Sequence, residues 1–327
     1  MEYSEISIIQ TELANSLGVS KAKMNNLAQQ YKLQGIQSGN TVKYPSCEVK
    51  RLLEEMGQKK KCRVITVNNI KGGVGKTIFT RELAYALAQH GAKTLMIDLD
   101  LQGTLSLICG VYNDELPTWK NVIKGEVEAS ELIIPIKENL SIISCNIGAG
   151  GIDREIGNKN IALLVKQYIE SLKEEYDAIV FDTRPEVSNI NLAAIIASDV
   201  VIVPTKADAG SQKGIGDTFR EIDLAEKEYS LYLENKKIKR SVIVNLFKQN
   251  RTTEMTKFVD IYNSYSDQVF PECLNDNTDM AQAYNEGKFL YELKRISPVN
   301  KFMRKLAVDL LELNSTKRSQ EGVVNVH

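Results

Sequence analysis

The sequence of 327 residues is poor in residue types that several kinds of active site require. Its only two histidines, His90 and His327, disfavour histidine-based catalysis and zinc hydrolysis. Its five cysteines are odd in number and widely spaced, without a CxxC pair, which argues against a disulfide framework or a zinc finger. The longest apolar run, residues 192–204, is interrupted by Ser198 and Asp199 and is too short to cross a bilayer. With no signal-peptide pattern in the first residues, these absences predict a cytoplasmic protein.

Charge of neither sign predominates over the whole chain. Lys and Arg number 41 against 42 Asp and Glu, a net charge of -1, so any nucleic-acid surface must be local. Residues 1–62 are locally basic and end in a lysine run, 59–61, before strand character begins at residue 64. We therefore predict an N-terminal domain over 1–62, a second domain over 63–313 and a flexible polar tail over 314–327.

From residue 63 onward, short β-branched runs alternate with longer segments of helical periodicity. The runs are residues 64–67, 94–97, 141–144, 178–181, 200–203 and 242–244. Strands that alternate with helices are joined by crossovers, which produces a mainly parallel sheet with helices on both faces. The sequence thus predicts an α/β fold, with a packing helix over residues 301–313 near its end.

The most specific motif is a glycine-rich loop between the first predicted strand and a predicted helix over residues 81–89. Backbone N–H groups of such a loop and the helix N-terminus surround phosphate oxygens, and a Cβ would block their approach. Lys76 would neutralise the β- and γ-phosphates, and the Thr77 hydroxyl would hold Mg²⁺. We predict binding of ATP or ADP with Mg²⁺. The predicted binding stretch is Gly72, Gly73, Val74, Gly75, Lys76, Thr77 and Ile78.

A second lysine, Lys71, stands at the entrance of this loop, and this stretch resembles the deviant Walker ATPases of the ParA/MinD family. The resemblance extends from residue 63 to about 313 and implies a P-loop NTPase fold with ATP hydrolysis. In that family the extra lysine reaches across a nucleotide-sandwich homodimer to the other subunit's phosphates. The resemblance implies this catalytic role for Lys71, together with Lys76.

Acidic motifs follow in the order that the family has. By resemblance, Asp100 would orient the attacking water and Asp98 would lie nearer the metal. Asp182 ends the strand that resembles Walker B and would hold Mg²⁺ through water. The family usually continues with two prolines, whereas here Arg184 precedes a single proline. Asn245 matches a position used for adenine recognition, although asparagine after a strand is also a common turn residue.

Residues 10–29 are typical of a helix-turn-helix. Gly18 allows a left-handed residue in the turn, and Ser20 is a good N-cap for the second helix. A hairpin wing over 34–44 and a helix over 48–56 follow, so we predict a small winged helix-turn-helix domain; a helical protein-docking domain is the alternative. The second helix exposes side chains suited to phosphates and major-groove edges. They are Lys21, Lys23, Asn25, Asn26 and Gln29.

Features outside the phosphate loop indicate which branch of the ParA/MinD family the sequence resembles. Residues 314–327 lack the apolar face of a MinD-like membrane helix, and no cysteines stand where nitrogenase-type iron proteins bind a cluster. A helix-turn-helix ahead of the ATPase resembles type Ia plasmid partition proteins. Arg251 matches a DNA-contacting position of relatives, but Asp279 replaces a DNA-binding arginine. The basic run 236–240 is a candidate replacement, with a solvated turn as the alternative.

We therefore expect a DNA-segregation ATPase associated with the nucleoid and with no membrane partner. ATP would close a homodimer that binds DNA without sequence preference, and a ParB-like centromere-binding protein would stimulate hydrolysis. The N-terminal module would bind an operator and regulate its own operon. Two alternatives stay open: a DNA-binding repressor that uses nucleotide only as a sensor, and a positioning ATPase for a cargo other than DNA.

Overall fold

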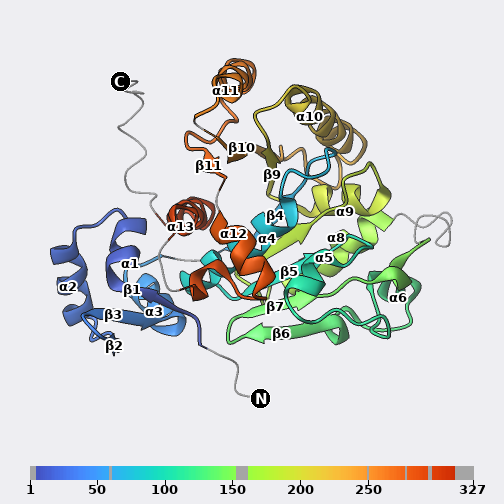
Figure 1. Ribbon diagram of the computed structural model, residues 1–327. Helices are drawn as coiled ribbons and strands as arrows, with labels where there is room; N and C mark the ends of the chain where they lie inside the picture. The colour runs from blue at the N-terminus through green and yellow to red at the C-terminus, as the bar shows by residue number, and fades with distance from the viewer. Residues whose placement is uncertain are drawn as a thin grey trace.

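An eight-stranded sheet forms the centre of the molecule (Figure 1). The computed structural model describes residues 5–58, 61–151, 161–248, 250–276, 278–293 and 297–313. The strands of the large sheet are β4 (Arg63–Val67), β5 (Thr94–Asp98), β6 (Ile133–Lys137), β7 (Leu140–Ile143), β8 (Ala178–Asp182), β9 (Val200–Thr205), β10 (Lys239–Phe247) and β11 (Leu274–Asn275).

The strands lie in the order β11-β10-β9-β4-β8-β5-β7-β6. Neighbouring strands are parallel except for β6, which pairs antiparallel with β7 at one edge. The predicted α/β fold with a mainly parallel sheet is confirmed. The edge strands β6 and β11 were not predicted, because Pro135 interrupts the β-branched run of β6 and β11 has only two residues.

Helices cover both faces of this sheet. One face packs against α4 (Lys76–Gln89), α5 (Thr104–Ile108), α12 (Thr278–Asn285) and α13 (Pro298–Leu310). The other packs against α6 (Trp119–Lys124), α8 (Ile161–Leu172), α9 (Asn189–Ala197), α10 (Ser211–Glu228) and α11 (Thr252–Tyr265). Short 3₁₀ turns are η1 (Ala129–Leu132), η2 (Ile147–Ala149) and η3 (Leu290–Glu292).

Strand residues alternate between the two hydrophobic cores. Ile65 and Val67 of β4 belong to the core under α4 and α13, whereas Val64 belongs to the core under α8 and α9. Successive side chains of a strand point to opposite faces, so a sheet covered on both sides needs apolar residues at every position. The uninterrupted apolar runs of the sequence reflect this burial.

The N-terminal residues form a small module of their own (Figure 1, blue). Its elements are β1 (Ser7–Ile9), α1 (Gln10–Ser16), α2 (Lys21–Gln30), β2 (Ile36–Ser38), β3 (Thr41–Pro45) and α3 (Ser46–Glu55). The strands pair antiparallel in the order β1-β3-β2. The hairpin β2–β3 lies where the wing was predicted, and β1 is an additional strand.

The N-terminal module packs directly on the second part of the chain. Leu13 of α1 and Leu52 of α3 share one hydrophobic core with Leu87 of α4 and Met303 of α13. The sequence predicted a domain boundary at residue 62 and gave no sign of this contact, since packing between distant segments leaves no local signal. The lysines at 59 and 60 and the predicted tail, 314–327, lie outside the described residues.

No described helix is both long enough and apolar enough to span a membrane.

Candidate functional site

The predicted phosphate loop lies between β4 and α4, at the carboxyl edge of the sheet. Gly73 and Gly75 have φ angles of 71° and 85°, in the left-handed region that favours glycine. A Cβ on Gly75 would lie 2.7 Å from Nδ2 of Asn245. A glycine turn that leads into the N-terminus of a helix is the arrangement that binds phosphate. In the remaining stretch Gly72 is exposed, Val74 is buried, and Thr77 and Ile78 are half-buried.

Two lysines flank this loop. Lys76 is buried, and its Nζ donates to the backbone oxygen of Asn69 at 3.0 Å. Burial lowers the pKa of Lys76, because it removes the ammonium group from water. Lys71 is half-buried at the loop entrance and forms an ion pair with Asp208. Each lysine is thus held within its own chain, one beneath the loop and one beside it.

The carboxylate of Asp182 ends β8 fully buried, close to the loop. The Thr80 hydroxyl donates to Oδ1 at 3.2 Å, and the Thr77 hydroxyl also bonds this carboxylate. Within the described part of the chain, Oδ2 is buried without a hydrogen-bond partner. Burial, reinforced by the neighbouring charge of Asp98, raises the pKa of Asp182 to about 8. A buried carboxylate oxygen without a donor fits a bound cation or its water ligand, as the predicted Mg²⁺ site requires.

Asp98 shapes the loop that follows β5. Its Oδ1 accepts the N–H of Asp100 at 3.0 Å, and its Oδ2 accepts the N–H and the hydroxyl of Ser106 at 2.9 and 2.7 Å. Burial raises the pKa of Asp98 to about 6. Its two oxygens thus hold Asp100 of the loop and Ser106 of α5, and Asp98 lies beside Asp182 in the register of β5 and β8, so its place nearer the metal stays a prediction. Asp100 is half-buried two residues beyond, at the same edge of the sheet.

Asn245 holds the phosphate loop from the side of β10. It is fully buried, and its Nδ2 donates to the backbone oxygen of Val74 at 2.8 Å. A pocket of about 690 Å³ opens beside it, with Asp208, Leu246 and Arg251 in its wall. The pocket thus lies between the residues that follow β9 and the first turns of α11, with Leu246, the neighbour of Asn245, in its wall.

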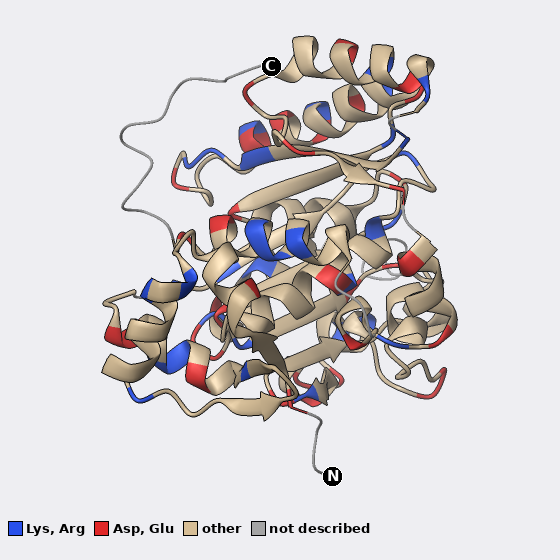
Figure 2. Cartoon of the chain, turned by 60° about the vertical axis from the view of Figure 1, so that its left-hand side comes forward, with Lys and Arg blue, Asp and Glu red and all other residues tan. Residues whose placement is uncertain are grey.

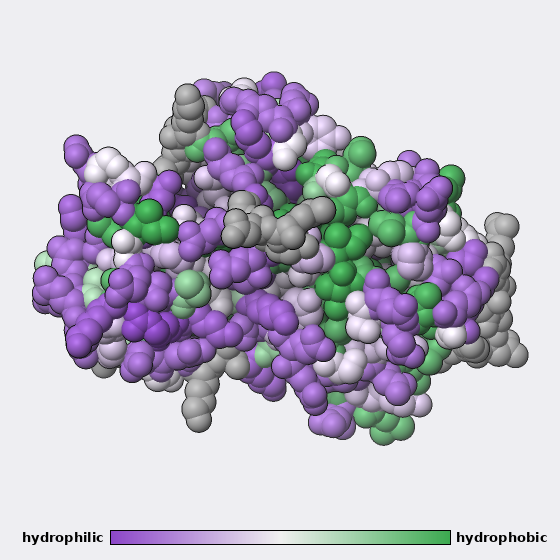
Figure 3. Space-filling view, turned by 90° about the horizontal axis from the view of Figure 1, so that it is seen from below, coloured by the Kyte–Doolittle hydropathy of each residue, from purple (hydrophilic) through white to green (hydrophobic). Residues whose placement is uncertain are grey.

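The N-terminal module presents a polar helix face. The turn residue Gly18 has a φ of 66°, and the Ser20 hydroxyl accepts the N–H of Lys23 at 3.1 Å, as the sequence predicted. Met24 of α2 is fully buried, which orients the helix. The five predicted contact residues are exposed: Lys21, Lys23, Asn25, Asn26 and Gln29. Figure 3 shows a mainly hydrophilic surface over this module, with hydrophobic side chains gathered elsewhere on the same face.

Of the two residues that bear on nonspecific DNA binding, one is exposed and the other is buried. Arg251 is exposed at the start of α11, with Nη1 3.4 Å from the Glu254 carboxylate. Asp279 lies in the first turn of α12 with only 2% of its surface exposed. Its carboxylate is therefore withdrawn from the surface that would face a DNA backbone, which the sequence did not indicate.

The basic run at residues 236–240 is matched by acidic residues. Figure 2 shows Lys and Arg interspersed with Asp and Glu over the visible surface. Paired charges attract a polyanion weakly, so this run is a poor replacement for a DNA-binding arginine. The ion pairs are Lys236 with Asp199, Lys237 with Glu226, and Arg240 with Asp223 and Glu226.

Several residues of the site were missed by sequence reasoning. Thr80 follows Thr77 by one helical turn, but the helix was predicted to begin only at residue 81. Ser106 and Glu221 reach the site from α5 and α10, and nothing in their local sequence marks them. Arg184 was visible only as a departure from the usual proline.

Comparisons with known proteins agree with this geometry. A family model described as an AAA domain matches residues 62–240, more than half of the chain. The sporulation initiation inhibitor protein Soj of Bacillus subtilis is 24% identical over 231 residues, covering 69% of this chain and 89% of Soj. The chromosome partitioning protein ParA of Myxococcus xanthus is 25% identical over 237 residues, covering 71% and 82%.

Solved structures share the fold. The ATP complex of a Cyanothece McdA variant has a TM-score of 0.69 at 22% identity, covering 78% of this chain and 98% of that one. Cobyrinic acid a,c-diamide synthase from Mycobacterium smegmatis has a TM-score of 0.61 at 25% identity, covering 69% of this chain and 92% of that one. That structure holds an ATP analog and magnesium, the ligands that this loop predicts. The chain therefore belongs to the AAA domain family, and it is similar in sequence to ParA and Soj.

Proposed function

We propose that this protein is a DNA-segregation ATPase that switches its DNA binding with bound nucleotide. The observation that carries the proposal is the phosphate loop with Lys71 and Lys76 beside the unpartnered carboxylate oxygen of Asp182. These groups would hold the phosphates and Mg²⁺ of ATP, and Mg²⁺ would stabilise charge that develops on the phosphates. Asp100 would orient the attacking water.

ATP would close a homodimer, with Lys71 leaving Asp208 to reach the second copy. The closed dimer would bind DNA through phosphate contacts, with Arg251 among them, and therefore with strong salt dependence. A centromere-binding protein would stimulate hydrolysis and release the dimer. Because Lys236, Lys237 and Arg240 are paired with carboxylates outside the run, this surface would need other cations.

The N-terminal module would add sequence-specific binding as a winged helix-turn-helix. Its exposed set on α2 suits base edges and phosphates, and the hairpin β2–β3 supplies the wing. Through it the protein would bind an operator and repress its own operon. Replacement of Asn26 by Ala would then weaken operator binding and leave nonspecific binding intact.

The test is binding of the purified protein to a random-sequence duplex with no nucleotide, with ADP–Mg²⁺ and with ATP–Mg²⁺, at two salt concentrations. Binding that requires ATP and falls steeply with salt supports the switch. Binding that is indifferent to nucleotide contradicts it and favours the repressor or a cargo other than DNA. Lys76→Ala, which should remove nucleotide binding, is the matched negative control.

A further inference from the structure

Two hydrogen bonds join the loop after β5 to the end of β8. The N–H of Leu99 donates to the backbone oxygen of Asp182 at 3.0 Å. The carbonyl of Leu99 accepts from Nε of Arg184 at 2.8 Å. Leu99 is only 2% exposed, and a buried backbone N–H or carbonyl group needs a hydrogen-bond partner. Both backbone groups of Leu99 find their partners in the segment that ends β8 and follows it. Asp100, the residue that would orient water, is the next residue of this loop.

Arg184 is itself held in a defined place. Its side chain is 8% exposed, and its Nη1 lies 3.5 Å from Glu186. Its backbone is fixed by Asn191 of α9, whose Nδ2 donates to the carbonyl of Arg184 at 3.0 Å and whose Oδ1 accepts its N–H at 3.3 Å. Asn191 is fully buried. The side-chain amide of α9 thus restrains the turn at the position where relatives have the first of two prolines.

We propose that Arg184 is a positioning residue that holds the Leu99–Asp100 segment against β8 for ATP hydrolysis. A guanidinium group suits this task because its planar donors have a fixed direction and it stays charged at every working pH. The inference rests on the proposed function in one respect, namely that Asp100 orients the attacking water.

The central variant is Arg184→Met, which keeps the aliphatic stem and removes the donor. In nucleotide-free protein, hydrogen exchange of peptides covering residues 98–103 should become faster, because the Leu99 carbonyl loses its partner. We expect kcat for ATP hydrolysis to fall about 10- to 100-fold, with KM changed by less than about threefold, since misplacement affects the reacting geometry more than binding. Arg184→Lys should recover part of both losses.

A double-variant comparison separates positioning from a general structural role. If Arg184 acts through Asp100, adding Arg184→Met to Asp100→Ala should slow hydrolysis little further. If the double variant instead loses kcat by the product of the two single losses, the proposal is overturned. Unchanged hydrogen exchange over residues 98–103 in Arg184→Met would overturn it as well. Arg220→Met, which removes an exposed arginine of α10, is the matched control and should change neither readout.

Two further outcomes have defined meanings. Faster exchange throughout β9 and β10 would show a general loss of structure in Arg184→Met, and the decision then rests on the same readouts in Arg184→Lys. If the unaltered protein hydrolyses no ATP, the proposed function fails, while the exchange experiment in nucleotide-free protein still decides whether Arg184 holds the loop.

Discussion

Lys76 lies in a place where little solvent reaches it. Only 7% of its surface is exposed, and its Nζ has the Asn69 carbonyl as a partner. A buried ammonium group gains strongly from an incoming phosphate, because that interaction replaces lost hydration. We expect Lys76→Ala to weaken nucleotide binding by about 100-fold or more.

Titration of a fluorescent ATP analogue measures the affinity of this variant. Lys227→Ala, at an exposed position of α10, is the control and should bind like the unaltered protein. Full affinity in Lys76→Ala would contradict the role of this lysine.

Glu221 makes stability depend on pH. It is buried on α10, and Nδ2 of Asn68 donates to its Oε2 at 3.2 Å, while Oε1 has no hydrogen-bond partner among the described residues. Burial raises its pKa from the ordinary 4.5 to about 7. The folded protein therefore holds this proton more tightly than the unfolded chain. The resulting stability is fully present below pH 4.5 and is lost as the pH rises through 7.

We expect Glu221→Gln to raise the free energy of unfolding relative to the unaltered protein at pH 8, by on the order of 3 kcal/mol, but not at about pH 4.5. Urea unfolding at several pH values measures this difference. Glu228→Gln, at an exposed position of the same helix, should show no such trend. An equal effect of Glu221→Gln at both pH values would argue against a titrating carboxyl at this position.

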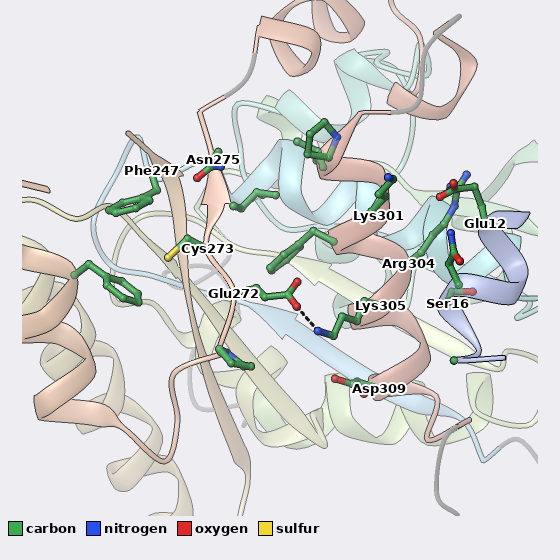
Figure 4. A pocket seen from close by; sticks show the side chains of 18 of the residues that line it. Glu12, Ser16, Phe247, Glu272, Cys273, Asn275, Lys301, Arg304, Lys305 and Asp309 are labelled. Atoms are coloured by element: carbon green, nitrogen blue, oxygen red, sulfur yellow. Dashed lines mark hydrogen bonds and ion pairs between the residues drawn. The ribbon is translucent and has the colours of Figure 1, made fainter. Parts of the chain in front are cut away.

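Among the elements, α4 connects the phosphate loop with the N-terminal module. At its far end, Nε2 of Gln89 donates to the backbone oxygen of Ser7 at 2.7 Å, and Nε2 of His90 lies 2.9 Å from the Ser16 hydroxyl. A cavity of about 820 Å³ between α1, α13 and β11 borders this contact (Figure 4). The helix that begins at the nucleotide site thus ends against β1 and α1.

A buried ion pair between Arg304 of α13 and Glu12 of α1 also joins the N-terminal module to the rest of the chain. Nη1 of Arg304 lies 3.0 Å from the Glu12 carboxylate, and its Nε donates to Gln89 at 2.9 Å. Arg304→Met leaves Glu12 buried without its cation, so we expect a loss of about 3 to 5 kcal/mol in the free energy of unfolding. Combining it with Glu12→Gln should recover part of the loss.

Chemical denaturation of both variants measures this coupling. Lys301→Met, on the exposed side of the same helix α13, should cost little and is the control. Equal losses in the single and double variants would show that the ion pair does not join the N-terminal module to the rest of the chain.

For the whole molecule, the proposed function gives Lys71 a role in joining two copies of the chain at the nucleotide site. Its ion pair with Asp208 is partly exposed, and such pairs contribute at most about 1 kcal/mol, so little opposes its release. Lys71→Ala should therefore lose ATP-dependent dimerisation and keep nucleotide binding. Asp208→Asn removes the partner that Lys71 must leave, so this variant should dimerise at the same protein concentration as the unaltered protein or at a severalfold lower one.

Sedimentation velocity with ATP–Mg²⁺, in an Asp100→Ala background that blocks turnover, measures both effects. Unchanged dimerisation of Lys71→Ala would rule out a contact of this lysine across the dimer. Weaker dimerisation of Asp208→Asn would show that the ion pair supports the closed state and does not compete with it.

The sequence predicted features that depend on neighbouring residues. The strand runs indicated the cores of β4, β5, β7, β8, β9 and β10, because burial on both faces requires apolar residues in succession. The glycine turn before α2 and its Ser20 cap were predicted for the same local reason, and both are confirmed. Strand ends and short edge strands were missed, since pairing partners far along the chain decide them.

By itself, then, the sequence determined the parallel α/β architecture and the nucleotide loop, because strand periodicity and the spacing of glycines and lysines are local properties. Only the tertiary structure decided that Arg184 reaches Leu99 and that the N-terminal module rests on α4 and α13. It also decided that Asp279 is buried. These outcomes depend on packing between segments distant in the sequence, where burial and geometry select each hydrogen-bond partner.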